Sequence, residues 1–400
     1  MTRVWRRFNL RLILLLLLLA LGAARQIAKE NRPSLLRPGL RMRAYVTNRG
    51  DGSASLTTGG TLTIVDLVTL GVVKSVGVGP EPSGVRAHPS RDEIWGVSTG
   101  GGFVWVLDVR NEQVVARIEV GAQPFAVDFS PDGSRAYVAA SGSGTVVAID
   151  CARREVVGRA RVGRRPWIAR ASPDGKLLVV PNRDDNTVAL LDAPTLAIVA
   201  TIPVAPRPEQ VVILPDGSKA FVSASGRPPG GGGGNNFGKY APAQVSVVDL
   251  RRHVLLANLP LPATPDDLIL EPKEGKLLLP SSESHGLTVI DTWRNEVEGF
   301  VLAGLSPVRG VLTSDQKTLF LSDASGHVIA LEYPPAAGRA ARPIGAGQSP
   351  GVCRLTPGED LLLVVNEDSD DLAVIATRSR RLITLVPVGA RPRDLAIKLF

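Results

Sequence analysis

The chain has 400 residues, 44% of them hydrophobic, 4% aromatic and 21% charged, and its formal net charge at pH 7 is +8. The positive charge is concentrated at the start. Residues 1–43 hold ten lysines and arginines against one glutamate, so residues 44–400 carry a net charge of −1. A near-neutral body without a basic stripe argues against nucleic acid as a partner.

The first 24 residues have the pattern of an export signal. Four arginines come before an apolar run, Leu12 to Ala20, and the small residues Gly22, Ala23 and Ala24 follow it. The apolar stretch is roughly 13 residues long, whereas a membrane-spanning helix needs roughly 20. We therefore predict a signal peptide at 1–24, with an uncleaved N-terminal anchor as the alternative, and a basic linker at 25–43. The protein is expected to be extracytoplasmic, either periplasmic or secreted.

After residue 43, a unit recurs about every 42 residues, eight times. Its landmark is an acidic residue at the end of an apolar strand, found at Asp66, Asp108, Asp150, Asp192, Asp249, Asp291 and Glu332, with Ala376 in the eighth copy. One interval, from Asp192 to Asp249, is longer than the others by 15 residues. A fixed period in the forties predicts a propeller or solenoid.

Within each unit, the residues favour short strands joined by tight turns. Segments such as Thr145–Ile149, Thr187–Leu191 and Gln244–Val248 are rich in β-branched residues and bounded by turn residues. Pro-Asp-Gly turns recur at Pro131, Pro173 and Pro215. These patterns predict an all-β fold.

The two ends of the chain complete one unit together. The first copy begins at Tyr45-Val46-Thr47-Asn48, which is the second strand of a unit. The missing first strand is supplied by residues 388–397, which align with residues 120–129. A closed ring needs such pairing because it leaves no exposed blade edge. We predict an eight-bladed β-propeller over residues 44–400, closed by the C-terminal strand, with seven blades as the alternative.

The tetrapeptide Tyr45-Val46-Thr47-Asn48 is the one that names the YVTN repeats, and residues 44–400 resemble the YVTN-repeat β-propeller family throughout. The resemblance implies the fold and says little about activity. Many members have seven blades, so eight recurrences depart from their pattern. The repeats are also distantly similar to the large subunit of quinoprotein amine dehydrogenases and to the propeller of d-type-haem nitrite reductases.

Charged and aromatic residues gather where the innermost strands begin, on the face we call the top. This set comprises Trp167, Glu209, Asp266, Asp267, Arg309, Arg393 and Asp394. Two positions further inward lie Arg86, Asp128, Arg170 and Arg354. Such charges either pair across the channel or converge on a polar ligand. The sequence leaves both interpretations open, and we predict that any ligand binds on this face.

Two enlarged loops belong to the same face. The first spans residues 49–60, and the second, residues 226–241, contains five consecutive glycines followed by Phe237, Lys239 and Tyr240. A glycine run favours a surface insertion that has no binding function. The alternative is a flap whose Phe237 and Tyr240 contact a ligand at the channel.

Catalytic and metal-binding patterns are weak, and no catalytic residue, metal or cofactor is predicted. The loops 182–186 and 366–371 are rich in oxygen ligands but lack the spacing and glycine of a calcium loop. His285 and His327 would share the top face, and two ligands do not make a zinc site. There is no C-x-x-C-H haem motif and no nucleophile elbow.

The sequence therefore predicts an exported, non-catalytic propeller that acts as a binding or scaffold module. Its top face would present a surface to a protein, a peptide or a small polar ligand, and it would meet a membrane only through an uncleaved N-terminal anchor. The alternative is a propeller enzyme or cofactor-associated protein, either lactonase-like or related to quinoproteins and d-type-haem proteins. The fold alone cannot choose between the two.

Overall fold

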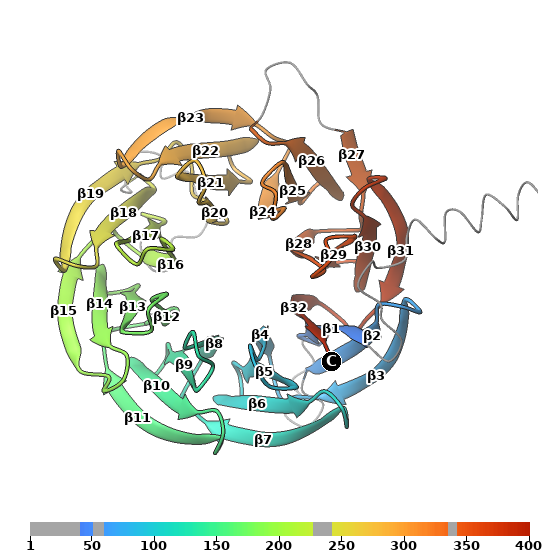
Figure 1. Ribbon diagram of the computed structural model, residues 1–400, viewed down its shortest axis with the longest axis horizontal. Coiled ribbons are helices and arrows are strands. Elements are labelled where there is room, and N and C mark those ends of the chain that lie inside the picture. Colours follow the sequence, from blue (N-terminus) through green and yellow to red (C-terminus); the bar gives the residue numbers. More distant parts are fainter. Residues whose placement is uncertain (1–40, 51–59, 227–241, 335–341) are drawn as a thin grey trace, which may run out of the picture.

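The computed structural model describes residues 41–50, 60–226, 242–334 and 342–400. These ranges form eight four-stranded antiparallel sheets around a central channel (Figure 1). The fold is therefore the predicted eight-bladed β-propeller, and the seven-bladed alternative is wrong. No helix in the described ranges is long and apolar enough to cross a membrane. The predicted signal peptide and nearly all of the predicted linker lie outside the described residues.

Each blade runs from an inner strand at the channel to an outer strand at the rim. The inner strands are β32 (Pro392–Leu399), β4 (Pro82–Ala87), β8 (Pro124–Phe129), β12 (Arg170–Ala171), β16 (Pro208–Ile213), β20 (Ile269–Glu271), β24 (Pro307–Leu312) and β28 (Pro350–Leu355). The second strands are β1 (Met42–Asn48), β5 (Glu93–Ser98), β9 (Arg135–Ala140), β13 (Leu177–Asn182), β17 (Lys219–Ala224), β21 (Lys276–Ser281), β25 (Thr318–Asp323) and β29 (Leu361–Asn366). The third strands are β2 (Thr61–Asp66), β6 (Phe103–Asp108), β10 (Thr145–Asp150), β14 (Thr187–Asp192), β18 (Gln244–Asp249), β22 (Gly286–Asp291), β26 (His327–Glu332) and β30 (Asp371–Ala376). The outer strands are β3 (Gly71–Gly77), β7 (Gln113–Glu119), β11 (Glu155–Arg161), β15 (Ile198–Pro203), β19 (Val254–Pro260), β23 (Glu296–Leu302), β27 (Arg342–Gly345) and β31 (Arg381–Pro387).

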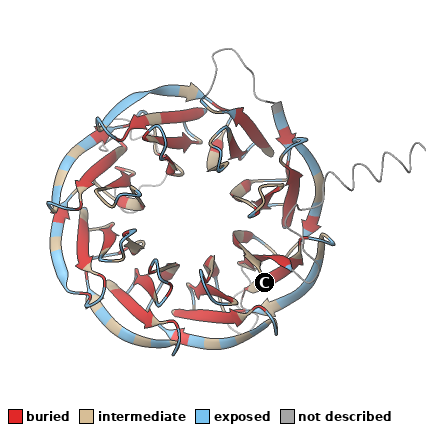
Figure 2. Ribbon diagram, viewed as in Figure 1, coloured by how far each residue is buried: buried red, intermediate tan, exposed pale blue. Residues whose placement is uncertain are grey.

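The core lies between neighbouring blades, because each sheet is covered on one face by the preceding blade and on the other by the following blade. The second and third strands are therefore apolar along most of their length, as in β5, where all six residues are buried. The outer strands alternate between exposed and partly buried residues, as in β11. In Figure 2 the second and third strands are mainly buried, and the outer strands at the rim are mainly exposed or intermediate.

The landmark acidic residue of the repeat has a structural task. Asp108 closes the turn between β6 and β7 by accepting the backbone N–H groups of Arg110 and Asn111 through Oδ1, both at 2.9 Å. Asp150 and Asp249 do the same in their blades. An aspartate that caps its own turn in this way fixes a hairpin locally. Its recurrence therefore marks the fold and not a ligand site.

The C-terminal strand closes the ring, as predicted. β32 pairs with β1 in antiparallel register from Met42–Leu399 to Asn48–Pro392. The backbones of Arg41 and Phe400 exchange two further hydrogen bonds of 2.9 Å. The first blade is thus built from both ends of the described chain.

Two inner strands are cut short by prolines in the strands beside them. The carbonyl of Pro181 accepts a hydrogen bond from the Trp167 N–H at 3.0 Å, and that of Pro280 accepts one from the Asp266 N–H at 2.8 Å. The carbonyl and the N–H of a strand residue point toward the same neighbouring strand. Because proline has no N–H, Pro181 and Pro280 cannot donate a hydrogen bond to the inner strand that they face. The ladder is interrupted there, so β12 and β20 begin only at Arg170 and Ile269.

Candidate ligand site at the channel mouth

A cavity of about 520 Å³ opens where the inner strands begin, and all eight blades contribute charged, aromatic or apolar side chains to its wall. Its volume lies within the usual range for small-molecule sites. Five arginines line it, and they are Arg86, Arg170, Arg309, Arg354 and Arg393. Among the described residues, two carboxylates, Asp267 and Asp394, line it with them.

Five of the residues singled out from the sequence line this cavity, namely Trp167, Asp267, Arg309, Arg393 and Asp394. Glu209 and Asp266 lie beside it and are engaged elsewhere. Glu209 pairs with Arg183 at 2.6 Å, and Asp266 accepts the Ser282 N–H through Oδ2 at 2.7 Å. Phe237 and Tyr240 lie outside the described residues.

Three carboxylates tie neighbouring blades together in the same way. Asp128 accepts the Ala171 N–H at 3.3 Å and pairs with Arg170 at 3.3 Å, both in the next blade. Asp267 repeats the pattern with the Gly310 N–H and Arg309, again at 3.3 Å each. Asp394 is the third of these carboxylates, and its partners in the next blade are the Val85 N–H and Arg86. Asp128 and Asp267 therefore each join two blades beside the channel.

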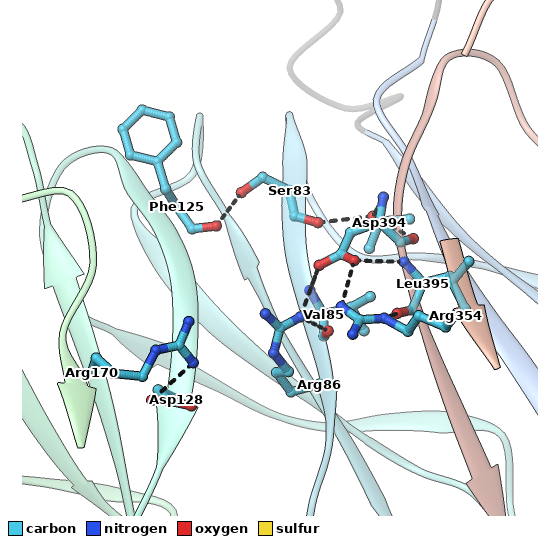
Figure 3. Close-up of polar contacts among 10 residues, drawn as sticks. Ser83, Val85, Arg86, Phe125, Asp128, Arg170, Arg354, Asp394 and Leu395 are labelled. Carbon is cyan, nitrogen blue, oxygen red and sulfur yellow. Dashed lines mark hydrogen bonds and ion pairs between the residues drawn. The ribbon is translucent and has the colours of Figure 1, made fainter. Parts of the chain in front are cut away.

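Asp394 makes the densest contacts of the three. Its Oδ2 accepts the Val85 N–H and Arg86 Nη1, each at 3.1 Å, and its Oδ1 accepts the Leu395 N–H at 2.9 Å and Arg354 Nη2 at 3.1 Å (Figure 3). Burial by itself raises the pKa of Asp394, but the two guanidinium groups and the two backbone donors bring it below the ordinary value. Asp394 is therefore ionised at neutral pH, with both oxygens occupied.

The charge balance differs between these clusters. Arg170 pairs with Asp128 and Arg309 with Asp267, one cation to one anion in both cases. Glu367 pairs with Arg393 at 3.1 Å and also with the more exposed Arg391 at 3.6 Å. Arg86 and Arg354 share the single carboxylate of Asp394. One positive charge is left without a counter-charge there.

An aromatic platform stands on one side of the cavity. The rings of Phe125 and Trp167 are stacked with centroids 4.4 Å apart, and the guanidinium of Arg183 lies 4.7 Å from the Trp167 ring. Arg183 is itself held by Glu209. Stacking on one side and a cation near the ring fix the indole at the channel mouth.

Two residues of this network escaped the sequence interpretation. Arg183 and Glu367 belong to the loops 182–186 and 366–371, whose sequences are rich in oxygen ligands but lack the pattern of a calcium loop. In the structure these loops supply partners to the channel mouth, and Asp185 of the first binds Arg164. Arg86 and Arg354 lie two positions further inward than the residues of the predicted site and are not part of that prediction. Nothing local to either one predicts that both bind Asp394.

The described residues contain no group of three or more His, Cys, Asp or Glu side chains placed to hold a metal ion. No histidine is among the described residues that line the cavity. Cys353 does line it, but burial raises the pKa of this thiol to about 12, so it is protonated at neutral pH. The side chains that line the cavity are thus suited to anionic and aromatic groups.

Comparison with known proteins gives a consistent picture. A family model described as cytochrome D1 heme domain matches residues 95–224. Among solved structures, hydrazine synthase of Kuenenia stuttgartiensis is similar over 69% of this chain and 90% of its own, with 23% identity and a TM-score of 0.55. A structure titled dihydro-heme d1 dehydrogenase NirN in complex with DHE is similar over 91% of this chain and 76% of its own, with 17% identity and a TM-score of 0.70. No curated protein sequence matches the chain. At these identities the structural likeness is one of fold.

Proposed function

We propose that this protein is an extracytoplasmic, cofactor-associated β-propeller that binds a planar, carboxylate-bearing ligand of the tetrapyrrole class at the channel mouth. The observation that carries the proposal is the convergence of five arginines on one cavity beside the Phe125–Trp167 stack. The family match to a haem domain over residues 95–224 supports it. Together they favour the cofactor-associated alternative over the plain scaffold that the sequence suggested first.

The described residues fit the organic part of such a ligand. Guanidinium groups bind carboxylates through charge-assisted and often bidentate hydrogen bonds. Trp167 and Phe125 line the cavity with aromatic surface, and Val211, Leu268 and Val352 give it an apolar wall that excludes water. These groups would bind and orient a conjugated ring that carries carboxylates at its edge.

The same residues do not fit the metal of such a ligand. A haem iron is held by His, Cys thiolate, Met or Tyr side chains. Of these types, the described cavity wall contains only Cys353, whose raised pKa keeps it a neutral thiol. We therefore assign binding and orientation to this chain, and we derive no step at a metal centre.

Titration with coproporphyrin, a tetrapyrrole with four carboxylates, tests this function. We expect a saturable change in the porphyrin absorbance together with quenching of Trp167 fluorescence, because the indole lines the cavity. Trp167→Phe should remove most of the quenching, whereas Trp293→Phe should not, since Trp293 is 66% exposed and does not line the cavity. Absence of binding by the wild-type protein would refute the proposal.

The extracytoplasmic location rests on the N-terminal pattern of arginines, a short leucine run and small residues. N-terminal sequencing after expression in a native-like host should find a chain that begins near Arg25, or an intact chain bound to the membrane. A cytoplasmic protein that begins at Met1 would contradict this part of the proposal.

A further inference from the structure

Arg86 and Arg354 face the cavity from two blades that are not neighbours. Arg86 lies on β4, Arg354 lies on β28, and the blade between them contributes β32 with Asp394. The Arg86, Arg354 and Asp394 side chains are 31%, 36% and 14% exposed, respectively. All three line the cavity, so a solute in the channel can reach both guanidinium groups.

The carboxylate between these arginines has no hydrogen-bonding capacity to spare. Asp394 already accepts from two backbone N–H groups and from one nitrogen of each arginine. Arg86 uses Nη1, which also donates to the Val85 carbonyl, while Arg354 uses Nε on the Leu395 carbonyl and Nη2 on Asp394. The remaining terminal nitrogens, Nη2 of Arg86 and Nη1 of Arg354, have no hydrogen-bond partner recorded among the described residues.

Electrostatics favours an anion at this point of the wall. Here two arginines that both line the cavity share one carboxylate, whereas Arg170 and Arg309 each have a carboxylate of their own. Arg393 shares Glu367 with Arg391, which does not line the cavity. Burial lowers the pKa of Arg86, Asp394 opposes that shift, and the neighbouring Arg354 and Arg170 add to it. A second anion between the two guanidinium groups would offset their mutual repulsion.

This cluster also lies on the seam of the ring. Asp394 belongs to β32, which pairs with β1 to complete the first blade. The seam is further tied by Thr47, whose hydroxyl donates to the Ser83 carbonyl at 2.8 Å and accepts the Asp394 N–H at 3.2 Å. Residues from the second, first and eighth blades therefore meet at one place, and their relative positions depend on closure.

We propose that one carboxylate of the ligand binds between Arg86 and Arg354, across the seam, so that occupancy of the channel stabilises the closed ring. This inference rests on the proposed function and deepens it, because it names the anchoring subsite and its consequence. The bound carboxylate would bridge the second and eighth blades, and the terminal strand would be held between them by Asp394. Any ligand that binds only the closed form raises its population by mass action.

The experiment uses the full chain and benzene-1,3,5-tricarboxylate as an anionic aromatic probe. Binding is measured by calorimetry for wild type, Arg86→Gln and Arg354→Gln. Each variant leaves Asp394 with one arginine, so one of its two ion pairs is kept while the positive charge of the cluster falls by one. Each should bind the probe about tenfold or more weakly, the equivalent of losing one charged hydrogen bond. Arg110→Gln is the control, because Arg110 pairs with Asp92, is 73% exposed and does not line the cavity.

Amide hydrogen exchange tests the link to closure. The probe should slow exchange in β1 and β32 of the wild type and leave β17, on the far side of the ring, unchanged. In Arg86→Gln this protection should be lost. Circular dichroism establishes that each variant is folded, and if one is not, the other carries the test. Wild-type affinity in both folded variants, or equal protection of β17 and the seam, would overturn the inference.

The two proposals can fail separately. Coproporphyrin binding that is insensitive to Arg86→Gln and Arg354→Gln would keep the proposed function and refute the seam subsite. Binding of the tricarboxylate at the seam without any binding of coproporphyrin would keep the subsite and refute the tetrapyrrole ligand.

Discussion

Removal of the Leu395 side chain tests how much the terminal strand contributes to the fold. Leu395 is fully buried and packs with Met42, Val46 and Val365, which come from the start of the chain and from the eighth blade. Truncating a large buried aliphatic residue to alanine costs about 2–5 kcal/mol, as the sum of lost transfer free energy and the cavity left behind. Leu395→Ala should therefore lower the free energy of unfolding by about that amount.

Equilibrium unfolding in urea provides the measurement. Leu305→Ala is the matched control, since Leu305 is 69% exposed, and surface substitutions usually change stability by less than about 0.5 kcal/mol. Deleting residues 391–400 should destabilise the protein further than Leu395→Ala, because it also removes the β1–β32 ladder and uncovers the edge of β1. If Leu395→Ala unfolds at the same midpoint as the control, the closure does not hold the ring together and the reasoning is wrong.

Three other predictions follow from buried groups and from the interrupted strands. Burial lowers the pKa of His88, whose Nδ1 accepts two backbone N–H groups, so the unfolded state binds the proton more tightly. The free energy of unfolding should therefore be highest above the ordinary histidine pKa of about 6.5 and should fall as the pH drops below it. Urea midpoints measured at several pH values should show this dependence, and His88→Ser should flatten it. Burial also raises the pKa of Cys151 and Cys353 to about 12, so both thiols should react slowly with a disulfide reagent at pH 8 and fast once the protein is unfolded; rapid reaction of the native protein would contradict this. Pro181→Val restores an N–H on the side facing the inner strand and should slow amide exchange just before Arg170, and unchanged exchange there would show that the proline does not interrupt the strand.

Valine-rich strand segments, Pro-Asp-Gly turns and capping aspartates act over only a few neighbouring residues. Local conformational preferences therefore specify each hairpin, and eight repetitions specify eight blades. The first unit lacks its first strand, and an extra strand follows residue 388. These two features predict the closure, because in a ring the extra strand can complete the first unit. The sequence alone was sufficient to predict the architecture and the face on which the inner strands begin.

The pairing of charges at the channel was decided only by the tertiary structure. Asp394 binds Arg86, which is 308 residues away, and Arg354, which is 40 residues away, and no local pattern records either contact. Glu209 and Arg393 were predicted as ligand-binding groups, yet their carboxylate and guanidinium meet Arg183 and Glu367 from loops of other strands. Propensity and periodicity describe the backbone of one repeat, whereas ion pairs depend on which side chains the closed ring brings within a few ångströms. For this reason the sequence predicted a charged channel mouth, and only the folded ring showed that Arg86 and Arg354 share one carboxylate there.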